Sequence, residues 1–293
     1  MRRWLAIARA TALEILSDPL SLLLLVAALT LTALAPAFHY HQFGEATRMA
    51  RDAGLSALFT CGLLVAVFGT IRSFRREIET GTLQMALAHP VSRTVFFLAK
   101  VVGITGACAV FSAIVFLTAL TIVNGAAIGG EIAAKSGDIA KIWGPSLALG
   151  LGTILLPLVI AAALNRFAQF RFVLTFFAFA VVLALAGAAY RLDLGLAGRL
   201  ASVVALVFVF ILAFLSLSAA AAVRFRANGA AAAAGLLFVL ALPVIGNYYL
   251  PDALANGGSV SPVDFVFAVL AAVPAIAAFL LAGIGLINGK DVA

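Results

Sequence analysis

The chain has 293 residues, of which 65% are hydrophobic and 11% charged, and its formal net charge is +7. A soluble globular domain is about half apolar and about a quarter charged, so this composition excludes a water-soluble fold and predicts an integral membrane protein. The two cysteines, Cys61 and Cys108, lie inside apolar runs, which favours small buried side chains over a disulfide framework.

Residues 1–19 predict an amphipathic interfacial helix rather than a cleaved signal peptide, because Glu14 and Asp18 interrupt the apolar surface. At 100° per residue, one arc is apolar and the opposite arc is charged. The apolar arc holds Trp4, Leu5, Ala8, Ala12, Ile15 and Leu16, and the charged arc holds Arg2, Arg3, Arg9, Glu14 and Asp18. Such a helix is typical of the membrane interface. The alternative is an ordinary cytosolic lead-in to the first span.

The transmembrane domain is predicted to occupy residues 20–293, since a span needs about 20 mainly apolar residues. Candidate spans are 20–38, 53–71, 95–123, 145–164, 172–190, 200–223, 234–250 and 264–287. The segment 234–250 is short and contains Pro243, Gly246 and Asn247, so it is either a span or a re-entrant helix shielded by protein. The expected fold is an all-α polytopic membrane protein with about eight transmembrane helices, or six plus re-entrant pieces.

The distribution of Lys and Arg predicts the orientation of the spans. With the N-terminus inside, 13 of the 19 basic residues fall on the cytosolic side, which places both termini in the cytosol. The net positive charge is therefore a topology signal, and no nucleic-acid partner is expected.

Motifs for catalysis are not found in the sequence: HExxH, GxSxG and CxxC do not occur. The C-terminal GIGLINGKD departs from a phosphate-binding loop, because the spacing from Gly283 to Gly289 is one residue too long and Asp291 replaces the Ser or Thr that holds magnesium. We therefore expect no enzymatic activity and no cofactor in this chain. His39 and His41 could contribute to a metal site, but interfacial side chains are the favoured interpretation, so no metal is expected.

Ion-coupled carriers are disfavoured by the spans themselves, which carry almost no acidic residues in their interiors. Charged residues inside a membrane usually mark ion or proton paths. Energy for uphill transport would then have to come from another subunit.

The cytosolic segment 72–93 is the most unusual part of the sequence. The second span is predicted to continue as a helix through Arg72 and Glu77 and to stop at Gly81, where glycine is a common C-terminal residue. Thr82 can cap a short helix over 83–88, Pro90 would end it, and Ser92 can cap the third span. The short helix has an apolar stripe made of Leu83, Ala86 and Leu87, with Met85 beside it. Such a ridge ringed by charge favours a docking surface, and a helix lying flat on the bilayer is the alternative.

This segment reads Arg-Glu-Ile-Glu-Thr-Gly-Thr-Leu-Gln-Met-Ala-Leu-Ala-His-Pro-Val-Ser-Arg from Arg76 to Arg93 and is followed by Lys100. It resembles the cytosolic coupling loop of type-2 ABC transporter permeases, and the N-terminal RATALEILSDP is similar to the family's interfacial connecting helix. The resemblance covers about the first 100 residues, and the remainder matches only in hydropathy. The family usually has six spans, so a count of eight departs from its pattern.

The resemblance implies a permease subunit of an ABC exporter, driven by a separate ATPase subunit that binds ATP and magnesium. It also implies a dimer with a second permease copy, contact with membrane lipid, and a multi-pass protein of the bacterial inner (cytoplasmic) membrane. The implied docking residues are Arg75, Arg76, Glu77, Glu79, Thr82, Leu83, Met85, Leu87, Pro90 and Arg93. Of these, Leu83, Met85 and Leu87 would enter a cleft on the ATPase, and the charged residues would fix its register. Two other hypotheses stay open: a membrane-embedded assembly or anchoring subunit without a transport path, and an ion-coupled carrier. The substrate stays open as well.

Overall fold

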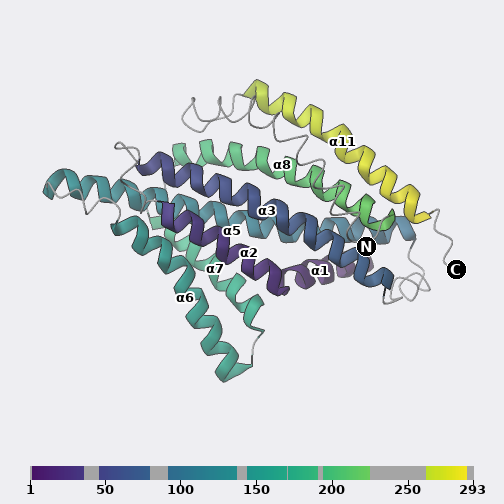
Figure 1. Cartoon of the computed structure of the whole chain (residues 1–293), viewed down its shortest axis with the longest axis horizontal. Coiled ribbons are helices and arrows are strands. Elements are labelled where there is room, and N and C mark those ends of the chain that lie inside the picture. Colours follow the sequence, from purple (N-terminus) through teal and green to yellow (C-terminus); the bar gives the residue numbers. More distant parts are fainter. Residues whose placement is uncertain are drawn as a thin grey trace. The chain divides into compact units, whose positions relative to one another are not determined.

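The computed structural model describes residues 2–35, 46–79, 92–136, 144–169, 171–190, 194–224 and 262–288, and Figure 1 shows them as a set of long helices. The helices are α1 (Arg2–Leu16), α2 (Pro19–Leu34), α3 (Ala46–Glu79), α5 (Arg93–Ser136), α6 (Gly144–Ala168), α7 (Phe172–Tyr190), α8 (Leu194–Arg224) and α11 (Pro262–Asn288). The prediction of an all-α protein is confirmed.

Within the described residues, five helices are long and apolar enough to cross a membrane, and a sixth crossing results if the bent pair Trp4–Leu16 and Pro19–Leu34 counts as one. Every predicted span other than 234–250 overlaps a helix. The segment 234–250 lies outside the described residues. A polytopic membrane protein is therefore confirmed, while the count of eight spans stays a prediction.

The helices α3 and α5 are longer than the spans predicted for them. α5 has 44 residues, which at 1.5 Å per residue corresponds to about 66 Å, about twice the thickness of a bilayer's hydrocarbon core. Positions assigned to outer loops, such as Arg51, Asp52 and Glu131, are consequently helical. A helix satisfies its own backbone hydrogen bonds, so it need not end where the apolar residues end.

Two helix starts show the capping that the sequence favours. Asp18 has an extended backbone, and its side chain accepts a hydrogen bond from the Leu20 amide at 3.3 Å, with Pro19 at the first helical position of α2. Ser92 caps α5, because its hydroxyl accepts from the Val95 amide at 3.3 Å. The predicted role of Ser92 is confirmed.

The described helices pack as two compact units, and each is described here by itself. Unit 1 comprises Met1–Ile15, Leu63–Ala109 and Gly198–Ala293, and unit 2 comprises Leu16–Gly62 and Val110–Ala197. The boundaries fall within α3 and α5, at the end of α1 and near the start of α8, so α3 and α5 each contribute a long part to each unit.

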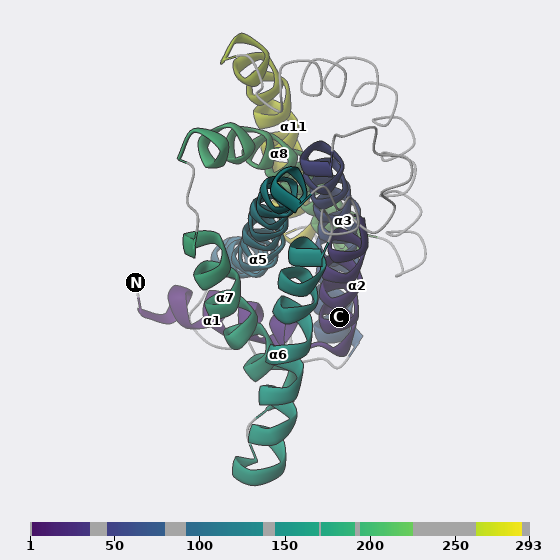
Figure 2. The same ribbon diagram turned by 90° about the vertical axis from the view of Figure 1, so that its left-hand side faces the viewer.

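In unit 2, α2 packs against α6 and α7, and α6 packs against α7 (Figure 2). Close approach depends on small residues, as is usual between membrane helices. A Cβ atom added at Gly150 of α6 would lie 2.8 Å from the Cβ atom of Ala33 in α2, and one added at Gly187 of α7 would lie 2.6 Å from Cγ2 of Thr121 in α5. These helices could not approach so closely with larger residues at the two glycines.

In unit 1, α1 crosses α5 where Gly103 faces the backbone of α1. A Cβ atom at Gly103 would overlap the carbonyl oxygen of Ala8 and lie 2.9 Å from Cβ of Thr11. Ile15 packs against Gly69 of α3. The predicted apolar arc of α1 is therefore divided: Ala8 and Ile15 are buried, together with Thr11, whereas Leu5 is 62% exposed.

Several hydroxyl groups within the helices are satisfied by their own helix. Thr32, Thr70, Thr121 and Ser218 each donate a hydrogen bond to the carbonyl oxygen four residues earlier. The cysteines Cys61 and Cys108 are buried and form no disulfide, as the sequence predicts.

Candidate functional site

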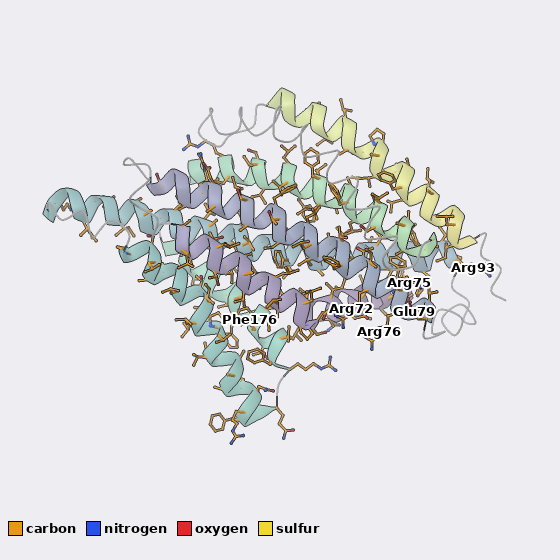
Figure 3. All side chains as sticks on the ribbon, in the orientation of Figure 1. Arg72, Arg75, Arg76, Glu79, Arg93 and Phe176 are labelled. Atoms are coloured by element: carbon orange, nitrogen blue, oxygen red, sulfur yellow. The ribbon has the colours of Figure 1, made fainter. Side chains whose placement is uncertain are left out.

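The candidate site is the end of unit 1 where α3 stops and α5 starts. Figure 3 shows Arg72, Arg75, Arg76 and Glu79 of α3 gathered at the same end as Arg93 of α5. α3 runs to Glu79 and α5 begins at Arg93, so the predicted continuation of the second span as a helix through Glu77 is confirmed. The two helix ends frame the intervening residues 80–91.

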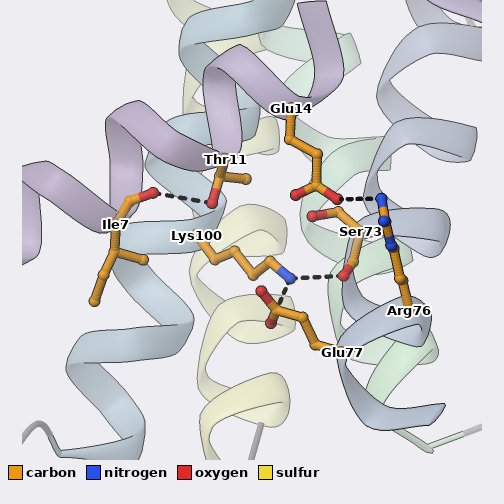
Figure 4. Close-up of polar contacts among 7 residues, drawn as sticks. All are labelled: Ile7, Thr11, Glu14, Ser73, Arg76, Glu77 and Lys100. Atoms are coloured by element: carbon orange, nitrogen blue, oxygen red, sulfur yellow. Dashed lines mark hydrogen bonds and ion pairs between the residues drawn. The ribbon is translucent and has the colours of Figure 1, made fainter. Parts of the chain in front are cut away.

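Lys100 of α5 is the centre of this site. Its side chain is fully buried, and its Nζ atom lies 2.6 Å from Oε2 of Glu77 in an ion pair. Nζ also donates a hydrogen bond of 2.6 Å to the backbone carbonyl oxygen of Ser73 (Figure 4). Since Glu77 and Ser73 both belong to α3, these contacts join the end of α3 to the start of α5.

Aromatic rings complete the surroundings of the ammonium group. Nζ of Lys100 lies 4.9 Å from the ring centroid of Phe74 and 5.9 Å from that of Phe96, within the range of cation–π attraction. The rings of Phe74 and Phe97 also contact each other, with centroids 5.4 Å apart. A carbonyl oxygen, a carboxylate and ring faces all favour a positive charge at position 100.

Two further ion pairs lie near the end of α3 and are more exposed. Arg76 Nη1 lies 3.5 Å from Oε1 of Glu14 on α1 (Figure 4), and Arg75 donates to Glu79 at 2.9 Å within α3. The side chains of Arg76 and Glu79 are 67% and 62% exposed. Exposed pairs contribute little to stability, so α1 is held mainly by its close packing, on α5 at Gly103 and on α3 at Gly69.

The start of α5 is also joined to α11. Arg93 Nη1 donates a hydrogen bond of 3.5 Å to the carbonyl oxygen of Ile287. A Cβ atom at Gly283 would lie 2.5 Å from Cζ of Phe97, so the ring packs directly on the backbone of α11. The start of α5 therefore has neighbours on α1 and α11.

The structure places five of the predicted docking residues: Arg75, Arg76, Glu77, Glu79 and Arg93. The remainder, Thr82, Leu83, Met85, Leu87 and Pro90, lie outside the described residues, as do His39 and His41. Glu77 faces inward to Lys100, although the sequence interpretation placed it with the rim charges.

Lys100 was missed as a site residue by sequence reasoning, which counted it only toward the cytosolic charge and as part of the family pattern. The signal was its position within the apolar run FFLAKVVG, one turn after Phe96. A lysine there either reaches the interface or has a buried partner. The buried charged residues in the described part of the chain are Arg51 and Lys100. Arg51 pairs with the adjacent Asp52 at 2.9 Å, so that pair joins no two helices.

Comparison with known proteins identifies the family to which the chain belongs. Residues 10–187 match the family model described as ABC-2 family transporter protein. No curated protein and no solved structure matches the chain. The matched residues include the second half of α1, all of α2, α3, α5 and α6, and most of α7, and they contain Lys100 and Glu77.

Proposed function

Because the chain belongs to the ABC-2 transporter family, we propose that it is the permease of an exporter whose segment 80–91 docks on the ATPase subunit. Membership of the family makes it a transmembrane subunit of an ABC transporter, and such a subunit works with an ABC ATPase. Export, the docking segment and the dimer go beyond the family match and are proposals.

The observation that carries the docking proposal is the charged end of α3. Arg75, Arg76 and Glu79 lie on a helix that continues past the apolar part of the span, and Arg93 lies at the same end (Figure 3). Charged residues around an apolar contact fix register and specificity. The apolar Leu83, Met85 and Leu87 lie between these two groups of charges in the sequence, which is the arrangement expected of an interface core with a polar rim.

The test introduces a charge into the proposed contact. Leu87→Asp is expected to insert into the membrane at the wild-type level and to lose co-purification with the ATPase subunit. The matched control is Phe167→Asp at the end of α6, since Phe167 is 88% exposed and lies outside the predicted span 145–164. Co-purification retained by Leu87→Asp, or lost equally by both variants, contradicts the docking role.

The direction of transport is tested in everted vesicles that hold the permease together with its ATPase. ATP added outside is expected to drive a hydrophobic fluorescent dye into the vesicle lumen. Dye uptake that requires an ion gradient and proceeds without the ATPase would instead favour the carrier hypothesis. A complex whose ATP hydrolysis responds to no cargo would favour the anchoring subunit.

The proposal also includes two copies of the permease in an inner membrane, which the family pattern supports. Both termini of each copy are proposed to lie in the cytosol, which the Lys and Arg bias of the sequence supports. Labelling of a cysteine at Thr47, whose side chain is exposed near the start of α3, by a membrane-impermeant maleimide added to whole cells tests the orientation. Absence of labelling in intact cells, with labelling after lysis, would place this end inside and contradict it.

A further inference from the structure

The ion pair between Lys100 and Glu77 joins the two helices that lead into and out of segment 80–91. Glu77 lies two residues before the end of α3, and Lys100 lies seven residues after the start of α5. Their atoms meet at 2.6 Å, and the same Nζ atom reaches Ser73 O at 2.6 Å. One lysine therefore contacts α3 at two positions one turn apart.

Stability alone does not account for a buried pair of this kind. Removing two charges from water offsets much of their attraction, and apolar residues of similar volume often stabilise a protein as well or better. What a buried pair can contribute is a defined position for the groups that carry it. At this site the defined position is that of α3 against α5, the two helices that flank the proposed docking segment in the sequence.

We infer that Lys100 and Glu77 are positioning residues that clamp α3 to α5, so that a push on segment 80–91 moves both helices together. This inference rests on the proposed docking function. Without the clamp, consisting of Lys100, Glu77 and the carbonyl of Ser73, the two helix ends could separate and absorb the displacement. With it, the displacement reaches α1 through the close packing at Gly103 and α11 through Phe97 and Gly283.

The two charges of the clamp cannot be exchanged, because the surroundings of position 100 suit only a cation. A carboxylate there would face the carbonyl oxygen of Ser73 and the ring of Phe74. Exchanging the charges, as in Lys100→Glu with Glu77→Lys, is therefore not expected to restore the clamp. Glu77→Gln is the conservative variant, since its amide oxygen can still accept a hydrogen bond from Nζ.

The experiment measures the separation of the two helix ends and the coupling to the ATPase in the same variants. Spin labels are attached to cysteines at Glu79 and Ser92, which flank the segment and are both exposed, with Cys61 and Cys108 replaced by alanine. The distance distribution is recorded for the permease alone in nanodiscs. Stimulation of ATP hydrolysis and co-purification are measured in the complex without labels.

The double variant Lys100→Met with Glu77→Leu removes both charges and leaves apolar side chains of similar size. We expect its distance distribution to broaden at least twofold and the stimulation of ATP hydrolysis to fall at least fivefold, while co-purification is unchanged. The matched control is Arg51→Met with Asp52→Leu, which removes a buried pair within one helix and should alter neither quantity. Glu77→Gln should retain the narrow distribution.

Any other combination overturns the inference. An unchanged distribution shows that the pair does not hold the helix ends, and a broadened one with normal stimulation shows that their separation does not matter. Loss of co-purification would make the pair part of the docking surface instead. If the double variant does not fold, Glu77→Asp, which withdraws the carboxylate by one methylene, is judged by the same two readouts. Since the distance measurement needs no ATPase, failure of the docking proposal is recognised separately through Leu87→Asp.

Discussion

Lys100 and Glu77 form one ion pair but differ in their access to water. The lysine side chain is fully buried, whereas the glutamate side chain remains 28% exposed. If the lysine is removed, the glutamate can be hydrated. If the glutamate is removed, the ammonium group loses its paired carboxylate and keeps the Ser73 carbonyl and the ring faces. The two ends of the pair should therefore respond differently to substitution.

The first prediction is that Glu77→Leu destabilises the protein more than Lys100→Met. An uncompensated buried charge costs about 3–5 kcal/mol, and the hydrated glutamate left by Lys100→Met avoids most of that cost. The double variant should be closer to wild type than Glu77→Leu is. Reversible unfolding in mixed detergent measures the free energies, and equal losses for the two single variants would contradict the asymmetry.

The second prediction concerns the contact between α1 and α5. Gly103→Val should displace α1, because even a Cβ atom at this position overlaps the carbonyl oxygen of Ala8. Trypsin cleavage after the exposed Arg9 is expected to become several-fold faster, since local opening governs such cleavage. Gly106→Val is the control, because a Cβ atom there has no neighbour within 4 Å. Equal cleavage of the two variants would show that the packing at Gly103 does not hold α1.

The third prediction concerns the packing of α6 on α2. At Gly150 a Cβ atom would lie 2.8 Å from Cβ and 3.1 Å from Cα of Ala33, and backbone atoms cannot yield as a flexible side chain can. Gly150→Val should destabilise the protein by about 1–3 kcal/mol. Gly152→Val, where a Cβ atom has no neighbour within 4 Å, should change the stability little. Thermal unfolding of the two purified variants provides the comparison, and a reversed order would refute the contact.

The fourth prediction is that Asp18→Ala weakens the start of α2. It removes the acceptor of the Leu20 amide, and loss of such a cap costs about 1 kcal/mol. Asp18→Asn keeps an acceptor oxygen and should retain most of the stability. Both variants are compared by unfolding in the same detergent. An equal loss for Asn and Ala would indicate that the charge of Asp18, rather than the cap, stabilises this region.

Much of the fold follows from hydropathy. Every predicted span within the described residues overlaps a helix, because an apolar run of this length has few other structures in lipid. The ends of the helices were less well predicted. Apolar residues show where a helix lies in the membrane, but α3 and α5 continue well beyond them through charged and glycine-containing sequence.

The candidate site could be predicted only in outline. The charges at Arg75, Arg76 and Glu79 were expected at the end of the second span from their position alone. The pairing of Lys100 with Glu77 could not be predicted, because it depends on which faces of α3 and α5 meet. A hydropathy pattern does not specify those faces. For the same reason the hydropathy pattern did not predict which side chains of α1 are buried. It grouped Leu5 with Ala8 on one apolar arc, although of these two only Ala8 is buried.

The hydroxyls of Thr32, Thr70, Thr121 and Ser218 each bond to their own helix, and this has a consequence for motion. When one of these helices slides or rotates against a neighbour, the bonds travel with it and none of them must break. The described contacts that resist such sliding are then the fit of small side chains and, between α3 and α5, the bonds of Lys100 with Glu77 and Ser73. These four hydroxyls therefore add no hydrogen bond that must break when the helices rearrange.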